Sequence, residues 1–167
     1  MPSLIVRFGD FFGPKPGQSW FNQALIKPGK PVTKVTLPGA AGVGHDWAYI
    51  PDAGETFAQL MDRDAELEPF TRFHFRGHWD HDGTRIVEAI RQASGNPDIK
   101  VKELPWAIFR MASPFNETLR EMIGVRPYWR APIELDNAEL VSFLGEEPHT
   151  PWDVAMTTTL RELGCLR

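Results

Sequence analysis

Short apolar runs alternate with longer segments of helical periodicity along this chain. Residues 4–6 are all leucine, isoleucine or valine, a pattern typical of a strand buried on both faces of a parallel sheet. Because such a strand is normally covered by preceding chain, its place near the start indicates a missing N-terminal part. Apolar residues of strand type predict further strands at 32–37, 47–50, 72–76 and 99–104.

The strongest helix signal lies in the middle of the chain. Asp52 and Glu55 have the spacing of a capping box, and Phe57, Leu60 and Met61 then fall on one helical face. These features predict a helix from about 53 to 62. Other helices are predicted at 20–26 after Ser19, at 86–93 closed by Gly95, at 106–124 with a break at Pro114 capped by Ser113, at 136–145 after Asp136, and at 150–164. Strands alternating with helices predict one α/β domain over 1–167.

Composition and charge narrow the classes of partner. The 167 residues are 42% hydrophobic and 24% charged, with a formal net charge of −4 and no basic run. A net negative charge without a basic run does not favour binding to nucleic acid or to an anionic membrane. No apolar stretch reaches the ~20 residues that are needed to span a bilayer. The single cysteine, Cys165, excludes a disulfide framework and a cysteine-rich zinc cluster within one chain. The cytoplasm is the expected compartment.

Common catalytic motifs do not occur in the sequence. The glycines of segment 39–44 lack G-x-G-x-x-G spacing and precede a predicted strand, whereas a dinucleotide site needs a helix N-terminus. No serine lies in G-x-S-x-G. A tyrosine–lysine pair at i, i+4 is missing too, since Ala53 follows Tyr49 and Pro132 follows Tyr128 at that spacing. We therefore assign no catalytic residue.

Three of the five histidines lie in segment 73–83, with the sequence FHFRGHWDHDG. On an extended strand His74 and His78 would project to one face, but Arg76 between them would place a cation beside a metal. Asp80 or Asp82, in turn, stands where the next helix needs an N-cap. The pattern favours a polar junction over a metal site. A small metal-binding enzyme that uses His74, His78 and His81 with these aspartates remains an alternative.

Three segments together resemble a known family. IVRFGDFFGP at 5–14, HDWAYIPDAGETFAQLM at 45–61 and LGEEPHTPWDVAMTTTLREL at 144–163 resemble, in order and separation, the C-terminal part of the NAD-dependent epimerase/dehydratase family, the extended short-chain dehydrogenase/reductases. The resemblance implies the C-terminal substrate-binding portion of a Rossmann-like α/β fold, with short parallel strands and helices. It also implies that the N-terminal nucleotide-binding half, with its glycine-rich turn and Tyr-x-x-x-Lys pair, is absent.

The resemblance also implies site residues. Asp10 stands where the family has an asparagine that touches substrate, and Phe11 where the chain passes the nicotinamide. His45 replaces an arginine that often grips a nucleotide-sugar diphosphate, and Trp47 follows it in the same block. The implied ligand is a sugar-like or other small carbonyl or hydroxyl compound, and a UDP-sugar is not supported. NAD or NADP is implied as cofactor, without binding to this chain alone.

A rival interpretation belongs to another functional class. A lone half with an uncovered strand at 4–6 would expose a sheet edge and apolar surface. Such a chain could be a non-catalytic binding or oligomerisation module, which assembles as a homodimer through that surface.

Overall fold

The computed structural model describes residues 3–15, 17–40 and 42–166; Ala41, within the glycine-rich segment 39–44, lies outside the described residues. The strands in this part of the chain form three small sheets. β1 (Ser3–Arg7) runs parallel to β5 (Phe70–His74), β2 (Asp10–Phe12) parallel to β4 (His45–Tyr49), β4 antiparallel to β6 (His78–Asp80), and β3 (Lys34–Leu37) parallel to β7 (Lys100–Glu103). The predicted α/β class with short parallel strands is confirmed.

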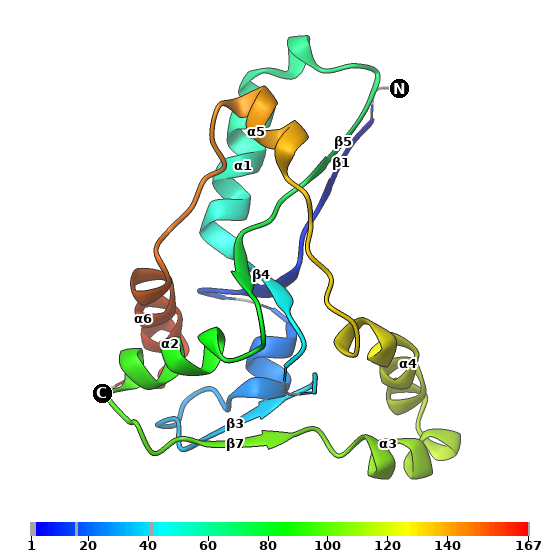
Figure 1. Ribbon diagram of the computed structural model, residues 1–167, viewed down its shortest axis with the longest axis vertical. Coiled ribbons are helices and arrows are strands. Elements are labelled where there is room, and N and C mark those ends of the chain that lie inside the picture. The colour runs from blue at the N-terminus through cyan, green and yellow to red at the C-terminus, as the bar shows by residue number, and fades with distance from the viewer. Residues whose placement is uncertain (1–2, 16, 41, 167) are drawn as a thin grey trace.

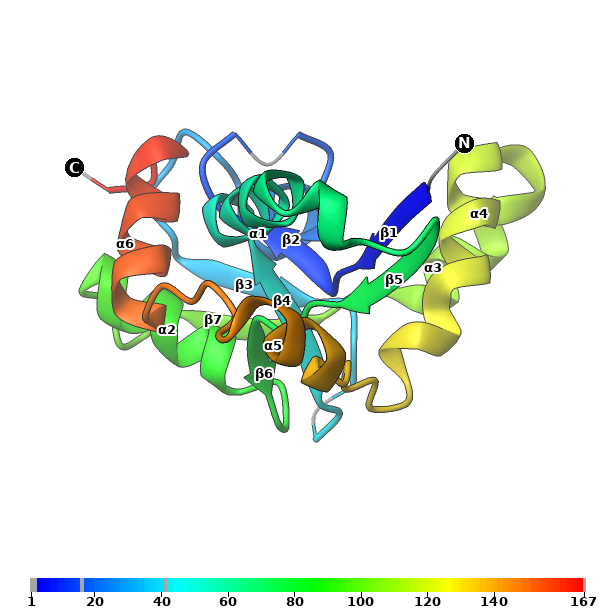
Figure 2. The same cartoon turned by 90° about the horizontal axis from the view of Figure 1, so that it is seen from above.

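Helices flank these sheets. The α-helices are α1 (Ile50–Asp62), α2 (Arg85–Ser94), α3 (Trp106–Ala112), α4 (Glu117–Val125), α5 (Ala138–Leu144) and α6 (Trp152–Glu162). Shorter helical turns are η1 (Phe21–Leu25), η2 (Asp64–Glu66), η3 (Ser113–Phe115) and η4 (Arg126–Trp129). Figures 1 and 2 show α2 and α6 at one side of the strands and the α3–α4 pair as an arm at the other. None of the described helices is long and apolar enough to cross a membrane.

Two apolar clusters hold the fold together. The larger joins β2, β3 and β4 to α2 and α6, and its fully buried members include Phe12, Val35, Trp47, Ile86, Ile90 and Leu160. The smaller joins β4 and β5 to α1 and α5 through Ala48, Leu60, Phe73, Phe75 and Leu140. Because β4 contributes to both clusters, the residues at its start are held from two sides.

The prediction of a strand buried on both faces at 4–6 is wrong. β1 forms, but among the described strands it pairs only with β5, and its side chains alternate between half-buried and exposed. Ile5 is 43% exposed, whereas Leu4 and Val6 pack against the smaller cluster. The face of β1 that carries Leu4 and Val6 is therefore packed, and the opposite face, with Ser3, Ile5 and Arg7, is exposed.

The capping box at Asp52 and Glu55 is also wrong. α1 already begins at Ile50, with Pro51 in its first turn, so Asp52 lies inside the helix. Its buried carboxylate instead accepts hydrogen bonds from the backbone N and the Oγ1 of Thr150, at 2.8 and 2.6 Å. Of the predicted apolar face, Leu60 is buried, while Phe57 and Met61 are exposed. A contact with a residue 98 positions away has replaced the local cap.

Two serine caps are wrong as well. Ser19 does not accept from the following turn; its backbone N and its hydroxyl both donate to the side-chain oxygen of Asn22. Ser113 donates to the carbonyl of Arg110, and the helix after Pro114 is capped by Asn116, whose side chain accepts from the N–H of Leu119. The break itself falls where it was predicted.

Of the two aspartates predicted to cap α2, Asp80 does bind its first amides, although the residue at the N-cap position is Thr84. Asp80 is fully buried, and its two carboxylate oxygens accept from the backbone N–H groups of Arg85 and Ile86 at 3.2 and 3.0 Å. Gly95 closes the helix in the left-handed conformation, as predicted.

Replacing Asp80 with alanine should destabilise the chain by about 2 kcal/mol, because two buried amide donors at the helix N-terminus lose their acceptor. Urea unfolding followed by circular dichroism measures the change. Asp136→Ala is the matched control, since Asp136 accepts from Ala138 at an exposed helix start. An equal, small loss in both variants would contradict the argument.

Candidate functional site

The candidate site begins with a carboxylate–imidazole pair. Asp10 opens β2 and His45 opens β4, and these strands pair in parallel with Asp10 opposite Trp47. This register brings together side chains that are 35 positions apart, and the Oδ2 of Asp10 lies 2.6 Å from the Nε2 of His45. The sequence predicted Asp10 and His45 as site residues separately; the structure brings them into direct contact.

His45 is held by aromatic rings. Its imidazole stacks on the indole of Trp129, with centroids 3.9 Å apart and planes 16° apart, and meets the Trp47 ring edge-on at 5.2 Å. Its second nitrogen, Nδ1, is buried and has no protein partner among the described residues. Because two aromatic side chains pack against the ring, the contact at Nε2 fixes the orientation of the Asp10 carboxylate. Asp10 is the more exposed of the two, with a side chain 28% accessible.

A cleft of about 390 Å³ opens beside this pair. Its lining includes Arg7, Phe8, Asp10, Tyr128, Ile133 and Leu135. Asp10 also lines a second hollow of about 490 Å³, together with Phe11 and Trp20. The Asp10 carboxylate thus stands on the wall between two hollows, where it could accept a proton or a hydrogen bond from a hydroxyl group bound in the cleft.

A second carboxylate, almost wholly buried, belongs to the lining of the same cleft. Asp46 is 2% exposed, and its Oδ2 accepts from the backbone N–H of Leu135 at 2.6 Å. Its Oδ1 is buried without a protein partner in the described part of the chain. Burial raises the pKa of Asp46 to about 6, against the lowering effects of the Leu135 amide and His45. The wall therefore contains a carboxyl group that changes charge near neutral pH.

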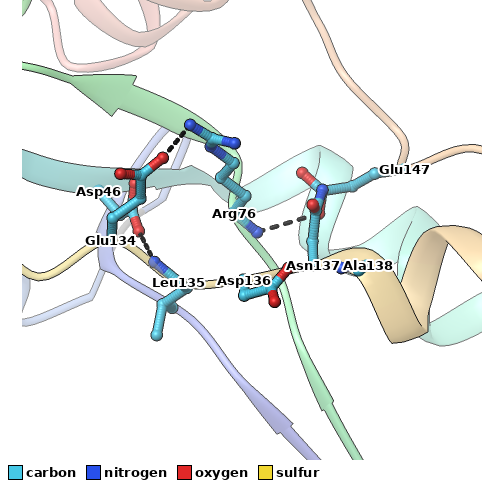
Figure 3. A network of polar contacts seen from close by, with 8 residues as sticks. All are labelled: Asp46, Arg76, Glu134, Leu135, Asp136, Asn137, Ala138 and Glu147. Atoms are coloured by element: carbon cyan, nitrogen blue, oxygen red, sulfur yellow. Dashed lines mark hydrogen bonds and ion pairs between the residues drawn. The ribbon is translucent and has the colours of Figure 1, made fainter.

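The segment that carries Leu135 is tied down by a polar network, which Figure 3 shows. Arg76 forms an ion pair with Glu134. Glu147 accepts from the backbone N–H groups of Arg76 and Gly77 at 2.9 and 2.7 Å, and from the side-chain nitrogen of Asn137 at 2.8 Å. These contacts attach the cleft wall to the turn between β5 and β6, so the cleft has a fixed rim.

The histidines of segment 73–83 do not converge. Within residues 3–15, 17–40 and 42–166, no three histidine, cysteine or acidic side chains are placed to hold a metal ion. His74 ends β5, and His78 is buried in β6, where it packs against Trp152 and against His149, whose ring centroid is 4.4 Å away. Burial, together with His149, lowers the pKa of His78 to about 3. The alternative of a metal centre built from His74, His78 and His81 is therefore not supported by their geometry.

The remaining predicted residues take different places. Phe11 is exposed and lines the second hollow. Trp47 is buried behind His45, away from the lining of the cleft, so its direct contact with substrate stays a prediction.

Sequence reasoning missed Asp46 and Trp129. A signal existed for Asp46, because it shares a strand face with the apolar Ala48, and a carboxylate on such a face is expected to be buried. Nothing in the sequence around Trp129 pointed to His45.

Two glycine-containing segments, one before β4 and one before α2, do not form a cradle for the pyrophosphate of a dinucleotide in the part of the chain that the structure describes. The glycine-rich segment 39–44 leads into β4 rather than into a helix. α2 does follow a glycine, Gly83, but Asp80 already occupies its first amides. A phosphate there would have to displace a buried carboxylate. We therefore derive no step through a nicotinamide cofactor on these residues.

Comparison with solved structures identifies the fold. UDP-glucuronic acid 4-epimerase from Bacillus cereus, solved with UDP-glucuronic acid and NAD, matches 98% of this chain with a TM-score of 0.64 and 14% identity. RMD from Pseudomonas aeruginosa, solved with NADPH, matches 96% with a TM-score of 0.62 and 12% identity. UDP-glucose 4-epimerase from Thermus thermophilus, solved with NAD, matches 96% with a TM-score of 0.58 and 19% identity.

This chain spans less than half of each of these proteins, covering 45%, 47% and 46% of their lengths. A scan against protein-family models and a search of curated proteins both gave no match. The expected portion of a Rossmann-like epimerase fold is confirmed at the level of structure.

Proposed function

We propose that this chain is the substrate-binding portion of an NAD(P)-dependent epimerase, dehydratase or reductase that acts on a sugar-like or other small hydroxyl or carbonyl compound. The observation that carries the proposal is the Asp10–His45 pair on the wall of the cleft, in a fold shared with proteins solved with NAD and NADPH. We do not expect this chain to be active alone, and we propose a cytoplasmic location, in keeping with the lone cysteine.

The pair suits recognition of a hydroxyl group. A carboxylate accepts hydrogen bonds through both oxygens, and His45 occupies only one of them. The other oxygen can accept a hydrogen bond from a substrate hydroxyl while the imidazole keeps the carboxylate in place. Hydride transfer would need the nicotinamide of NAD or NADP, which the nucleotide-binding portion of such an enzyme holds.

Titration of the chain with NADH or NADPH in a calorimeter should give no measurable binding. The reason is that neither the 39–44 segment nor the turn at Gly83 presents a helix N-terminus with free amides to a pyrophosphate. Sugars added to ¹⁵N-labelled chain should instead shift the amide signals around Asp10 and His45. Micromolar affinity for NADH would contradict the assignment of the chain to the substrate side.

A homodimerising module is the second candidate. It is favoured by the uncovered face of β1 with Ile5, and by the exposed Phe57 and Met61 one turn apart on α1. Light scattering over a concentration series tests it, since apolar surface of this kind drives association. A clean monomer at high concentration would remove this candidate.

A further inference from the structure

The cleft beside Asp10 has a charge pattern that selects among ligands. We propose, on the basis of the function proposed above, that it takes a neutral polyhydroxylated compound at Asp10 and discriminates against phosphorylated or carboxylated ones. The juxtaposition behind this is a pair of carboxylates, Asp10 and Asp46, which both belong to the lining of one cleft.

Asp10 meets any ligand that enters the cleft. His45 binds its Oδ2 at 2.6 Å, which leaves Oδ1 without a side-chain partner among the described residues. An ionised carboxylate can only accept hydrogen bonds, so it binds ligands that carry O–H or N–H donors more tightly than ligands that do not. An anionic oxygen at the same point would face like charge and lose its hydration without gaining a donor.

Asp46 adds to this negative field. Gly9, which precedes Asp10 in the chain, packs closely against Asp46, since a Cβ placed on it would lie 2.8 Å from the Cβ of Asp46. Among the described residues its one hydrogen-bond partner is the Leu135 amide. His45 and Arg76 lower the pKa of Asp46 from nearby, but burial outweighs them, and Arg76 is itself paired with Glu134. A phosphate next to Asp10 would therefore approach two carboxylates and an imidazole that is already hydrogen-bonded, and Arg7 would be the one cation in the lining of the cleft.

The other groups of the lining fit a neutral ligand. Arg7 is the cation at the rim, but it is exposed on β1, where water and salt screen its charge. Phe8, Ile133 and Leu135 supply apolar walls for the C–H faces of a ring, and Tyr128 supplies a hydroxyl group at the edge. A mostly apolar lining with a small number of polar groups that point into the cleft is typical of binding sites for small molecules.

The test is a titration of the full ¹⁵N-labelled chain with three matched probes: galactose, galactose 6-phosphate and UDP-galactose. We expect galactose to shift the amides of Gly9, Asp10, His45 and Leu135, and both phosphorylated probes to bind there at least tenfold more weakly at pH 7.5. Asp10→Asn should remove most of that tenfold preference, since an amide can also donate to a phosphate. Asp98→Asn, an exposed aspartate outside the cleft, is the control and should leave it unchanged.

Asp46→Asn is a second variant that removes a charge without touching the His45 contact, in case Asp10→Asn unfolds. It too should narrow the preference for galactose. If a phosphorylated probe shifts the same amides as strongly as galactose does, the proposed ligand class is overturned, while the substrate-binding function stands. If none of the probes shifts these amides, both are overturned.

Discussion

Gly9→Ala is expected to destabilise the folded chain by about 3 kcal/mol or more, and to loosen the candidate site with it. Gly9 lies between β1 and β2, against the start of β4. A Cβ at this position would lie 2.2 Å from the backbone oxygen of Asp46 and 2.6 Å from its carbonyl carbon. These atoms belong to a central strand, so they cannot move aside as a flexible side chain would.

The clash would act directly on the site. β2 can escape the added methyl group only by moving away from β4, and this movement would lengthen the 2.6 Å contact between Asp10 and His45. Urea unfolding at pH 7 should therefore show a lower midpoint for Gly9→Ala, and the His45 ring signals should change in the NMR spectrum.

Gly54→Ala is the matched control for this glycine. Gly54 lies exposed within α1, and a Cβ there meets no atom within 4 Å. Alanine is favoured over glycine in a helix interior, so this variant should gain about 0.5–1 kcal/mol. Equal midpoints for the two variants would show that the packing of Gly9 against Asp46 is not tight.

The sequence predicted the fold wherever local signals were strong. Apolar periodicity located α2 and β7, and Gly95 and Asp80 closed and capped α2 as expected, because these effects act within one or two turns. The capping box predicted at Asp52 was wrong because the prediction used only the local spacing to Glu55. In the structure Thr150, from the C-terminal region, donates to the Asp52 carboxylate instead. β6 was missed because three residues are too few for a strand pattern to show.

The site, like the fold, could be predicted only as far as local sequence signals reach. Asp10 and His45 could be named from the segments that carry them, but their contact depends on the parallel register of β2 and β4. Trp129 reaches His45 from a turn 84 positions later in the chain, and no periodicity encodes that approach. Contacts between residues far apart in the chain therefore decide that Asp10 faces the cleft and that His45 supports Asp10.

Asp46→Asn is expected to remove a pH dependence of about 3 kcal/mol from the stability of the chain. The pKa of Asp46 is raised from 3.8 to about 6 in the folded state, mainly by burial. Between these values the unfolded chain loses the proton while the folded chain keeps it, so stability falls as pH rises from about 4 to 6. A pKa that is higher by one in the folded state corresponds to about 1.4 kcal/mol. The loss is complete above pH 6 and does not occur below pH 4.

Asparagine keeps the shape of the side chain and can still accept from the Leu135 amide, but it cannot ionise. Urea unfolding of both proteins at pH 4, 5, 6, 7 and 8 gives the difference in stability between them at each pH. Other titrating groups, such as Asp82 and Glu66, whose pKa values are lowered in the fold, contribute equally to both and cancel. Any constant cost of burying an amide shifts the whole difference curve without changing its slope.

The difference curve should therefore be flat below pH 4, move in favour of Asp46→Asn up to about pH 6, and be flat again above it. A curve that is level throughout would mean that Asp46 titrates in the folded chain as it does in the unfolded one. Its carboxylate would then be solvated rather than enclosed by β4 and the 133–135 segment. The same result would weaken the case for a negative cleft wall, because an exposed charge is screened by water and salt before it can act on a ligand.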